Sequence, residues 1–267
     1  MKIPKKAVLC MDVDGTLIDA NETIHQQDAS LLEDFPESIQ PILTTGRSLY
    51  TACAVLHHNN LFRGEPLPLP GVFLNGGAAY LPGETLCTRH IFTHATLESL
   101  RGLAPGHDRS AFTFFTLEKV YLVNPNTFAR HISQIHYLEA VEVGVEDVPD
   151  DVIKLMVLDQ DKAGLKAIKD ITGEWEVEGA YSLPYAYEIN PPGITKANTL
   201  AGLLNAMAMD HLPIYTVGDG ENDLSLFKRS RKSFAPASAH PAILEVADEI
   251  IHREKEGILK PIIDQIQ

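Results

Sequence analysis

The chain has 267 residues, of which 45% are hydrophobic and 22% charged, and its formal net charge is -14 at pH 7. This length and composition are typical of one large or two moderate globular domains. The acidic balance argues against non-specific nucleic-acid binding, which needs a basic surface. Because the three cysteines are widely spaced and no stretch reaches the ~20 apolar residues that cross a membrane, we expect a soluble cytoplasmic protein without membrane partners.

The first part of the chain predicts strands that alternate with helices. It opens on an unbroken apolar run at 7–11, which is typical of a buried strand in a parallel sheet. The elements expected after it are a helix at 28–35, a strand at 39–43, a helix at 48–58 and a strand at 72–74. This alternation predicts a doubly wound α/β sheet.

From about residue 84 the pattern changes to mixed strands and helices. Strands are expected at 88–92, 111–115, 120–123, 141–145, 153–158, 174–178 and 185–189, and helices at 94–103, 128–138 and 161–171. The first pattern then returns, with helices expected at 195–207, 224–229, 240–246 and 254–266 and strands at 214–217 and 232–235. The sequence therefore predicts a core domain made of 1–83 and 190–267, with an α+β domain inserted at 84–189.

Polar residues follow the predicted strands of the core or begin its helices. These clusters are Asp12 with Asp14, Thr45 with Gly46, Lys196, and Asp219 with Asn222 and Asp223. Because the carboxyl ends of parallel strands meet at one edge of a sheet, we expect the clusters to line one crevice. Two crowded aspartates need an offsetting charge, and Mg²⁺ suits carboxylate and carbonyl ligands.

This set of residues supports phosphoryl transfer. Asp12 would attack phosphorus to form an aspartyl phosphate, and Asp14 would act as general acid and base. Asp12, the backbone carbonyl of Asp14 and Asp219 would hold Mg²⁺. Lys196 would bring positive charge to the phosphoryl oxygens, and Thr45 would donate hydrogen bonds to them.

Each cluster also has a simpler explanation. Thr45 alone is most often a helix cap, and Lys196 alone is most often solvated in a first helical turn. Asn222 and Asp223 could cap the helix that follows them. The conjunction of all the clusters in this order is a much stronger indication than any one of them.

Four motifs carry a family resemblance: Asp12-Val13-Asp14-Gly15-Thr16-Leu17, Leu43-Thr44-Thr45-Gly46-Arg47, Gly193-Ile194-Thr195-Lys196 and Gly218-Asp219-Gly220-Glu221-Asn222-Asp223. Together they resemble the haloacid dehalogenase (HAD) superfamily, and the last motif resembles its Cof-type phosphatases. The resemblance implies a Rossmann-like core with an inserted C2-type cap domain. It also implies Mg²⁺-dependent hydrolysis of sugar phosphates or other small phosphorylated metabolites.

The resemblance also implies a role for each matching residue. Asp12 would be the nucleophile and Asp14 the acid/base. The metal set would be Asp12, Asp14 and Asp219, with Asp223 supporting it from outside the direct ligands. The phosphate contacts would be the Val13 backbone, Thr45, Gly46, Lys196 and Asn222. The expected substrate selectors are Arg47 and Asn75 on the core, with Lys119, Lys154 and Tyr181 on the cap.

Two other functions use the same chemistry. A phosphoacceptor signalling domain also groups aspartates, Thr and Lys around Mg²⁺, but it needs neither a proton shuttle such as Asp14 nor a large insert. A phosphomutase would return the phosphate from Asp12 to a sugar hydroxyl, and the sequence leaves this alternative open, as it does the choice between monomer and homodimer.

Overall fold

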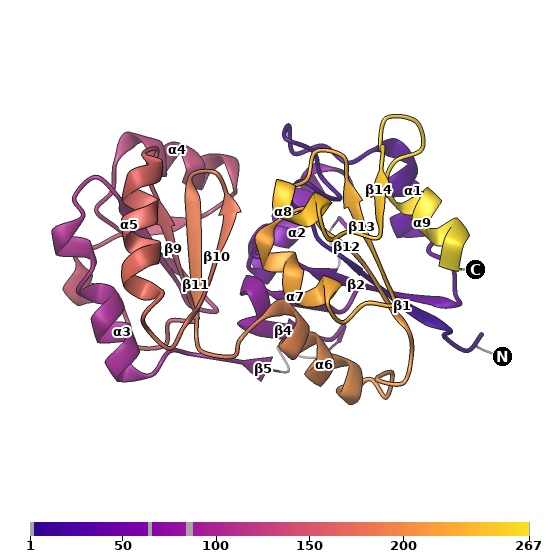
Figure 1. The fold of residues 1–267 in the computed structure, drawn as a ribbon, viewed down its shortest axis with the longest axis horizontal. Helices are drawn as coiled ribbons and strands as arrows, with labels where there is room; N and C mark the ends of the chain where they lie inside the picture. The colour runs from indigo at the N-terminus through magenta and orange to yellow at the C-terminus, as the bar shows by residue number, and fades with distance from the viewer. Residues whose placement is uncertain (1–2, 64–65, 84–87, 267) are drawn as a thin grey trace. The chain divides into compact units, whose positions relative to one another are not determined.

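The computed structural model describes residues 3–63, 66–83 and 88–266, which form two compact units (Figure 1). The first unit comprises Met1–Cys87 and Lys196–Gln267, and the second comprises Thr88–Thr195. The second unit overlaps the inserted domain that the sequence predicts at 84–189. In the described part of the chain, each helix is too short or too polar to span a lipid bilayer.

The first unit is built on a parallel sheet with β1 (Ala7–Met11) in its interior. β1 pairs in parallel with β2 (Ile39–Thr44) on one side and with β12 (Ile214–Val217) on the other. The strand order is β14-β13-β12-β1-β2-β3-β4, with β13 at Lys232–Pro236, β14 at Glu249–Ile251, β3 at Gly71–Phe73 and β4 at Ala78–Tyr80. Only the pairing of β3 with β4 is antiparallel among these described pairs. The predicted Rossmann-like α/β core is confirmed.

The apolar run of β1 is continuous because the sheet is covered. All five residues of this strand are buried, as expected for a parallel strand with helices on both faces. One covering helix is α6 (Lys196–Ala206), whose apolar residues recur at helical spacing. Its side chains pack with those of the strands in one buried cluster that includes Ala197, Leu200, Leu203, Leu204, Val8, Cys10, Ile42 and Val72.

The other helices of the first unit are α1 (Gln26–Glu33), α2 (Leu49–His58), α7 (Leu224–Phe227), α8 (Pro241–Leu244) and α9 (Leu259–Ile266), with single 3₁₀ turns η1 (Leu74–Gly76) and η4 (Glu221–Asp223). Helix α2 begins after Ser48, whose side chain accepts a hydrogen bond from Thr51 N, as an N-cap does. Helices α1 and α9 lie side by side near the C-terminus (Figure 1).

The predicted helix at 254–266 is wrong in its first turn. Helix α9 starts only at Leu259, because Gly257 takes a left-handed φ of 70° that interrupts a helix. Asp28, fully buried in α1, accepts hydrogen bonds from the Ile258 and Leu259 N–H groups at 2.8–3.0 Å. A residue far away in sequence therefore satisfies the free N–H groups at the start of α9.

The second unit has a mainly antiparallel sheet with helices packed on it. Its strand order is β10-β11-β9-β6-β7-β8, and only β7 and β8 pair in parallel. The strands are β6 (Ala111–Phe115), β7 (Val120–Val123), β8 (Ala140–Glu142), β9 (Lys154–Leu158), β10 (Glu178–Leu183) and β11 (Ala186–Asn190), and the unit begins with β5 (Thr88–Arg89). The helices are α3 (His94–Arg101), α4 (Thr127–Ile135) and α5 (Lys162–Thr172), with 3₁₀ turns η2 (Ala104–Gly106) and η3 (Val145–Asp147).

The core of the second unit lies between its sheet and helices α3 and α5. Leu97, Leu100, Leu165 and Ile168 from the helices form one buried cluster with Phe112, Phe114, Leu155, Val157, Tyr187 and Ile189 from the strands. Both strands predicted at 111–115 and 120–123 are confirmed. The strand predicted at 174–178 is wrong, because β10 begins only at Glu178, where it pairs with Asn190.

Candidate active site

The loop after β1 carries the first pair of aspartates. The Asp12 N–H continues the sheet by donating to Val217 O at 3.0 Å, so Asp12 is fixed by the ladder that holds the strand. Gly15 follows with a φ of 70°, and a Cβ at this position would lie 2.1 Å from Asp219 Oδ2. Only glycine permits both this backbone conformation and this approach. The loop therefore brings Asp219 of the β12 end against the end of β1.

Lys196 is the first residue of α6 and its side chain is fully buried. Its Nζ donates to Asp12 Oδ1 and to Asp223 Oδ1, both at 2.7 Å. A buried lysine at a helix N-terminus is unfavourable unless carboxylates compensate for it. Burial alone would lower the pKa of Lys196, but the charges of Asp12 and Asp223 outweigh burial and raise it. The lysine is therefore charged and holds both carboxylates.

Asp223 organises the loop after β12. Its Oδ2 accepts hydrogen bonds from the Asp219 N–H at 3.1 Å and from the Gly220 N–H at 3.2 Å, while its Oδ1 receives Lys196. A Cβ at Gly218 would come within 2.4 Å of the Asp223 carboxyl group. Both oxygen atoms of the Asp223 carboxylate therefore accept hydrogen bonds, one from Lys196 and the other from its own loop.

Three carboxylates gather around this lysine. Asp12, Asp219 and Asp223 each offer an oxygen atom within 4.8 Å of the others. Burial raises the pKa of Asp12 well above its ordinary value, and Asp223 and Asp219 add to that shift while Lys196 opposes it. Burial, followed by the charge of Asp223, raises the pKa of Asp219 to about 7. With all four groups ionised the cluster carries excess negative charge, and its hard oxygen atoms suit a divalent cation such as Mg²⁺.

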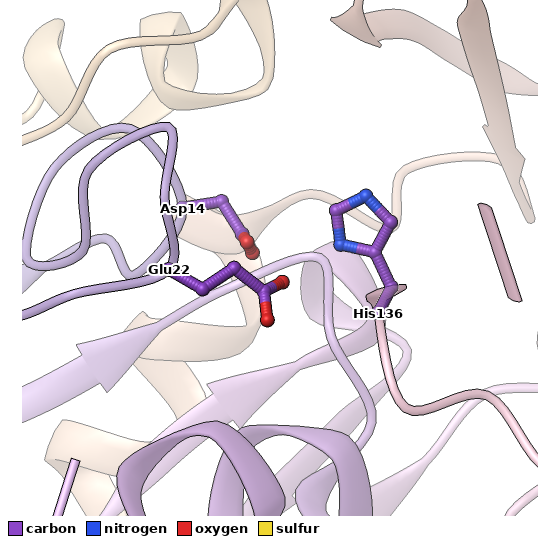
Figure 2. A group of neighbouring side chains, drawn as sticks. All are labelled: Asp14, Glu22 and His136. Atoms are coloured by element: carbon purple, nitrogen blue, oxygen red, sulfur yellow. The ribbon is translucent and has the colours of Figure 1, made fainter. Parts of the chain in front are cut away.

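The end of β2 contributes Thr45, Gly46 and Arg47. Thr45 is fully buried, its N–H donates to Val72 O at 2.9 Å, and its Oγ1 accepts from the Arg47 N–H at 3.0 Å. The Arg47 side chain contacts Asp14 through Nη2 at 2.6 Å and Glu22 through Nη2 at 2.9 Å. Figure 2 shows the carboxyl groups of Asp14 and Glu22 next to each other.

The polar residue Asn75 lies against Asn222. Asn222 Nδ2 donates to Asn75 Oδ1 at 3.0 Å, and both Leu74 and Asn75 take left-handed φ values of 52° and 56°. Thr199 of α6 donates to Gly76 O at 2.7 Å and so ties this turn to the helix that starts with Lys196. The turn after β3 thereby positions the Asn222 amide.

The residues expected to select a substrate in the second unit differ in environment. Lys119 is exposed in the turn between β6 and β7. Lys154 is buried and donates to Glu188 Oε1 at 2.8 Å, with its Nζ 4.5 Å from the centre of the Phe115 ring. Tyr181 packs against Tyr187, with ring centres 5.1 Å apart.

The structure brings several predicted residues into direct contact, and it also reveals one that sequence reasoning missed. Asp12, Asp223 and Lys196 are joined by hydrogen bonds, and Asp219 lies beside them. Glu22 had not been singled out, because it lies in a polar turn and its sequence neighbourhood gives no sign that it contacts Arg47. The acidic residue could have been found only by asking what neutralises the arginine of the Thr-Gly-Arg motif.

Comparison with known proteins places the chain in a family. Residues 9–262 match the family described as haloacid dehalogenase-like hydrolase. The 5-amino-6-(5-phospho-D-ribitylamino)uracil phosphatase YcsE of Bacillus subtilis is 25% identical over 259 residues, which cover 96% of this chain and 94% of that protein. The chloroplastic endoribonuclease YBEY of Arabidopsis thaliana is 24% identical over 97% of this chain, which spans only 46% of that longer protein.

A solved structure agrees with the fold. The subclass IIB sugar phosphatase BT4131 of the HAD superfamily superposes with a TM-score of 0.82 at 17% identity, covering 98% of this chain and all of the other. At this sequence identity, the structural similarity indicates the fold alone. The family match covers nearly the whole chain and agrees with the motifs at the ends of β1, β2 and β12. The chain therefore belongs to the haloacid dehalogenase-like hydrolase family and, as its motifs predict, to the Cof type.

Proposed function

We propose that this chain is a Mg²⁺-dependent phosphatase that hydrolyses a small phosphorylated metabolite, such as a sugar phosphate, through an aspartyl phosphate on Asp12. The observation that carries the proposal is the buried Lys196 Nζ, 2.7 Å from both Asp12 and Asp223. A solvated first-turn lysine, the simpler explanation of Lys196, does not account for its complete burial. A lysine held against a carboxylate at the end of a central strand suits a nucleophile that must meet an anion.

The reaction has two steps. In the first, the Asp12 carboxylate attacks phosphorus, the bond between phosphorus and the leaving oxygen breaks, and Asp14 gives its proton to that oxygen. In the second, water attacks the phosphorus of the aspartyl phosphate, Asp14 takes the proton of the water, and inorganic phosphate leaves with Asp12 regenerated. Lys196 on Asp12 Oδ1 orients the nucleophile throughout.

Donors around Asp12 bind the phosphoryl oxygens. We assign this role to the Thr45 hydroxyl, the backbone N–H groups of Val13 and Gly46, the Asn222 amide and the Lys196 ammonium. The contact between Asn222 and Asn75 supports the assignment, because it fixes the direction of one amide. Such fixed donors stabilise the charge that develops on phosphorus oxygens in the transition state.

The carboxylate cluster fits a divalent cation. Asp12, Asp219 and the backbone carbonyl of Asp14 would hold Mg²⁺, while Asp223 stays bound to Lys196 and its own loop. The raised pKa values of Asp12 and Asp219 reflect buried carboxylates that a cation would stabilise in their charged form. When bound, the ion supplies positive charge where a carboxylate meets an anionic phosphate.

The relatives and the second unit support this substrate class. The YcsE relative acts on a phosphorylated ribitylamino uracil, and BT4131 is named a sugar phosphatase. We propose that the second unit is the cap and that it selects the substrate with Lys119 and Tyr181, while Arg47 and Asn75 contribute from the core. Lys154 is buried and held by Glu188 instead. An inserted unit that excludes water favours turnover over a phosphoacceptor role.

The test is the release of inorganic phosphate from a panel of phosphorylated metabolites, with Mg²⁺ and with EDTA. The panel includes sugar phosphates, sugar-alcohol phosphates and short carboxylic-acid phosphates. We expect release that needs Mg²⁺ and that differs between compounds. A stable phosphoprotein without phosphate release would instead support the phosphoacceptor function, and transfer to a second sugar hydroxyl would support a phosphomutase.

A further inference from the structure

Arg47 lies between two carboxylates of the first unit. Its Nε is 2.9 Å from Asp14 Oδ2 and 3.0 Å from Oδ1, and its Nη2 is 2.6 Å from Asp14 Oδ1. The same Nη2 is 2.9 Å from Glu22 Oε1. The arginine side chain is 6% exposed, whereas those of Asp14 and Glu22 are 34% and 20% exposed. The guanidinium is therefore buried between a residue of the proposed reaction and one with no proposed role.

The contact with Asp14 restrains the orientation of its carboxylate. A guanidinium is planar, and two of its N–H groups on one carboxylate fix the direction of that carboxylate as well as its distance. Asp14 must present one oxygen to the leaving group, so its orientation affects proton transfer directly. Arg47 itself is anchored by its N–H on Thr45 Oγ1 and by its carbonyl, which accepts from Leu74 N.

Glu22 is held in place from the opposite side. Its N–H donates to Asp19 O at 3.0 Å, and its carbonyl accepts from Asn59 Nδ2 at 2.9 Å. Asn59 Oδ1 in turn accepts from Ile24 N at 2.9 Å. These bonds fasten the turn that carries Glu22 to the end of α2. The glutamate can therefore hold the guanidinium from a fixed position.

The backbone at Glu22 does not favour a glutamate. Its φ is 56°, a left-handed conformation in which glycine is unstrained and asparagine is tolerated. A glutamate there carries backbone strain. The turn alone thus gives no reason for this residue type, whereas the contact of its carboxylate with Arg47 does.

We propose that Glu22 is a positioning residue, which holds Arg47 so that Arg47 presents Asp14 to the leaving oxygen of the substrate. This inference rests on the proposed function, in which Asp14 protonates that oxygen. In this role Glu22 acts through its contact with Arg47 and does not touch the phosphoryl group.

Substrates with different leaving groups distinguish a positioning role of Glu22 from a purely structural one. An alkyl phosphate has a poor leaving group that needs a proton from Asp14, whereas 4-nitrophenyl phosphate has a good one that departs without it. The ratio kcat/KM reports the steps up to departure of the alcohol, so it isolates this first proton transfer. A misplaced Asp14 therefore slows alkyl phosphates selectively.

The experiment compares kcat/KM of the wild type, Glu22→Gln and Arg47→Lys on the best alkyl phosphate of the panel and on 4-nitrophenyl phosphate. We expect Glu22→Gln to lose about tenfold on the alkyl substrate and less than about twofold on the aryl one. Arg47→Lys, which keeps the charge but loses the planar fork, should lose more, with the same selectivity. Glu33→Gln, on an exposed glutamate of α1, is the matched control and should change neither value.

Equal losses on both substrates, or no loss on either, would overturn the inference. Thermal unfolding of Glu22→Gln is measured alongside, so that a folding defect is seen separately from a change in selectivity. If the wild type released no phosphate from any compound, the proposed function itself would fail. A wild type that is active and unaffected by Glu22→Gln would leave that function standing and refute only the role of Glu22.

Discussion

Among the residues that the structure describes, each unit buries a lysine against carboxylate groups, and the two sites differ in charge balance. Lys196 of the first unit lies between Asp12 and Asp223, with Asp219 nearby. Lys154 of the second unit pairs with Glu188 and lies over the ring of Phe115. The first cluster has more carboxylates than cations, whereas the charges of the Lys154–Glu188 pair cancel.

The difference indicates what each site can do. Burying excess negative charge lowers the stability of the folded state. We therefore expect such a cluster where a bound cation or a reaction needs the carboxylates. A balanced pair needs no external ion and supports the packing of its own sheet. We therefore expect substitutions at the first site to change chemistry and metal response, and substitutions at the second to change mainly stability.

The largest expected effect is the loss of turnover in Asp12→Asn. The amide has nearly the same shape as the carboxylate but is a poor nucleophile, so kcat should fall by at least about 10³-fold, about 4 kcal/mol. Steady-state kinetics measure the loss, and circular dichroism checks the fold. A variant with wild-type kcat would show that Asp12 is not the nucleophile.

The next effect concerns the balanced pair. Lys154→Met leaves the carboxylate of Glu188 buried without its lysine and should lower the free energy of unfolding by about 3 kcal/mol. The double variant Lys154→Met/Glu188→Leu removes both charges and should recover most of that loss. Urea denaturation measures all three proteins. If the double variant were as unstable as the single one, charge balance would not explain this pair.

A smaller effect is expected from Mg²⁺ on stability. Because the proposed cation would bind the folded cluster and not the unfolded chain, an excess of Mg²⁺ over its dissociation constant should raise the free energy of unfolding by about 2 kcal/mol. Asp219→Asn should remove most of this gain, whereas Glu188→Gln in the second unit should not. An equal response in Asp219→Asn and the wild type would place the cation elsewhere.

The smallest effect is the pH dependence of the metal-free protein. The pKa of Asp219 is raised to about 7, mainly by burial and then by the charge of Asp223. A carboxyl whose folded-state pKa is raised stabilises the fold below its unfolded pKa, and this stability is lost as pH rises through the folded value. In EDTA the free energy of unfolding should therefore fall by about 1 kcal/mol between about pH 6 and about pH 8.

The control for this pH dependence is again Asp219→Asn, which should flatten the profile over the same range. With Mg²⁺ the slope should weaken or reverse, because the proposed cation would bind the ionised carboxylates and so gain affinity as pH rises. A metal-free profile that rises with pH would mean that Asp219 is not the group that titrates here.

Much of the fold could be predicted because the deciding signals were local. The apolar run of 7–11, the strand of 214–217 and the helix that begins near Lys196 each stand out in a short window and appear as β1, β12 and α6. The start of α9 could not be predicted, because it depends on a cap from Asp28 in a distant helix. The short strands β4 and β14 have only three residues each, too few for a periodic signal.

Part of the candidate site could likewise be predicted from local signals, and part of it could not. Asp12, Lys196 and Asp219 follow strands or begin a helix, so the topology of a parallel sheet was enough to expect them together. The contacts of Asp14 with Arg47, and of Arg47 with Glu22, depend on how side chains from separate loops meet. No pattern within either loop indicates which partner a carboxylate will find.

The most direct test of the central claim is to trap the phosphoryl group on Asp12. In Asp14→Asn, a substrate with a good leaving group such as 4-nitrophenyl phosphate can still phosphorylate Asp12, but the water that should hydrolyse the intermediate lacks its base. Mass spectrometry of the quenched protein should then find phosphate on the peptide that contains Asp12. The same peptide of the double variant Asp14→Asn/Asp12→Asn should carry no phosphate. Phosphate on a different residue, or the same amount on both proteins, would contradict an aspartyl phosphate at Asp12.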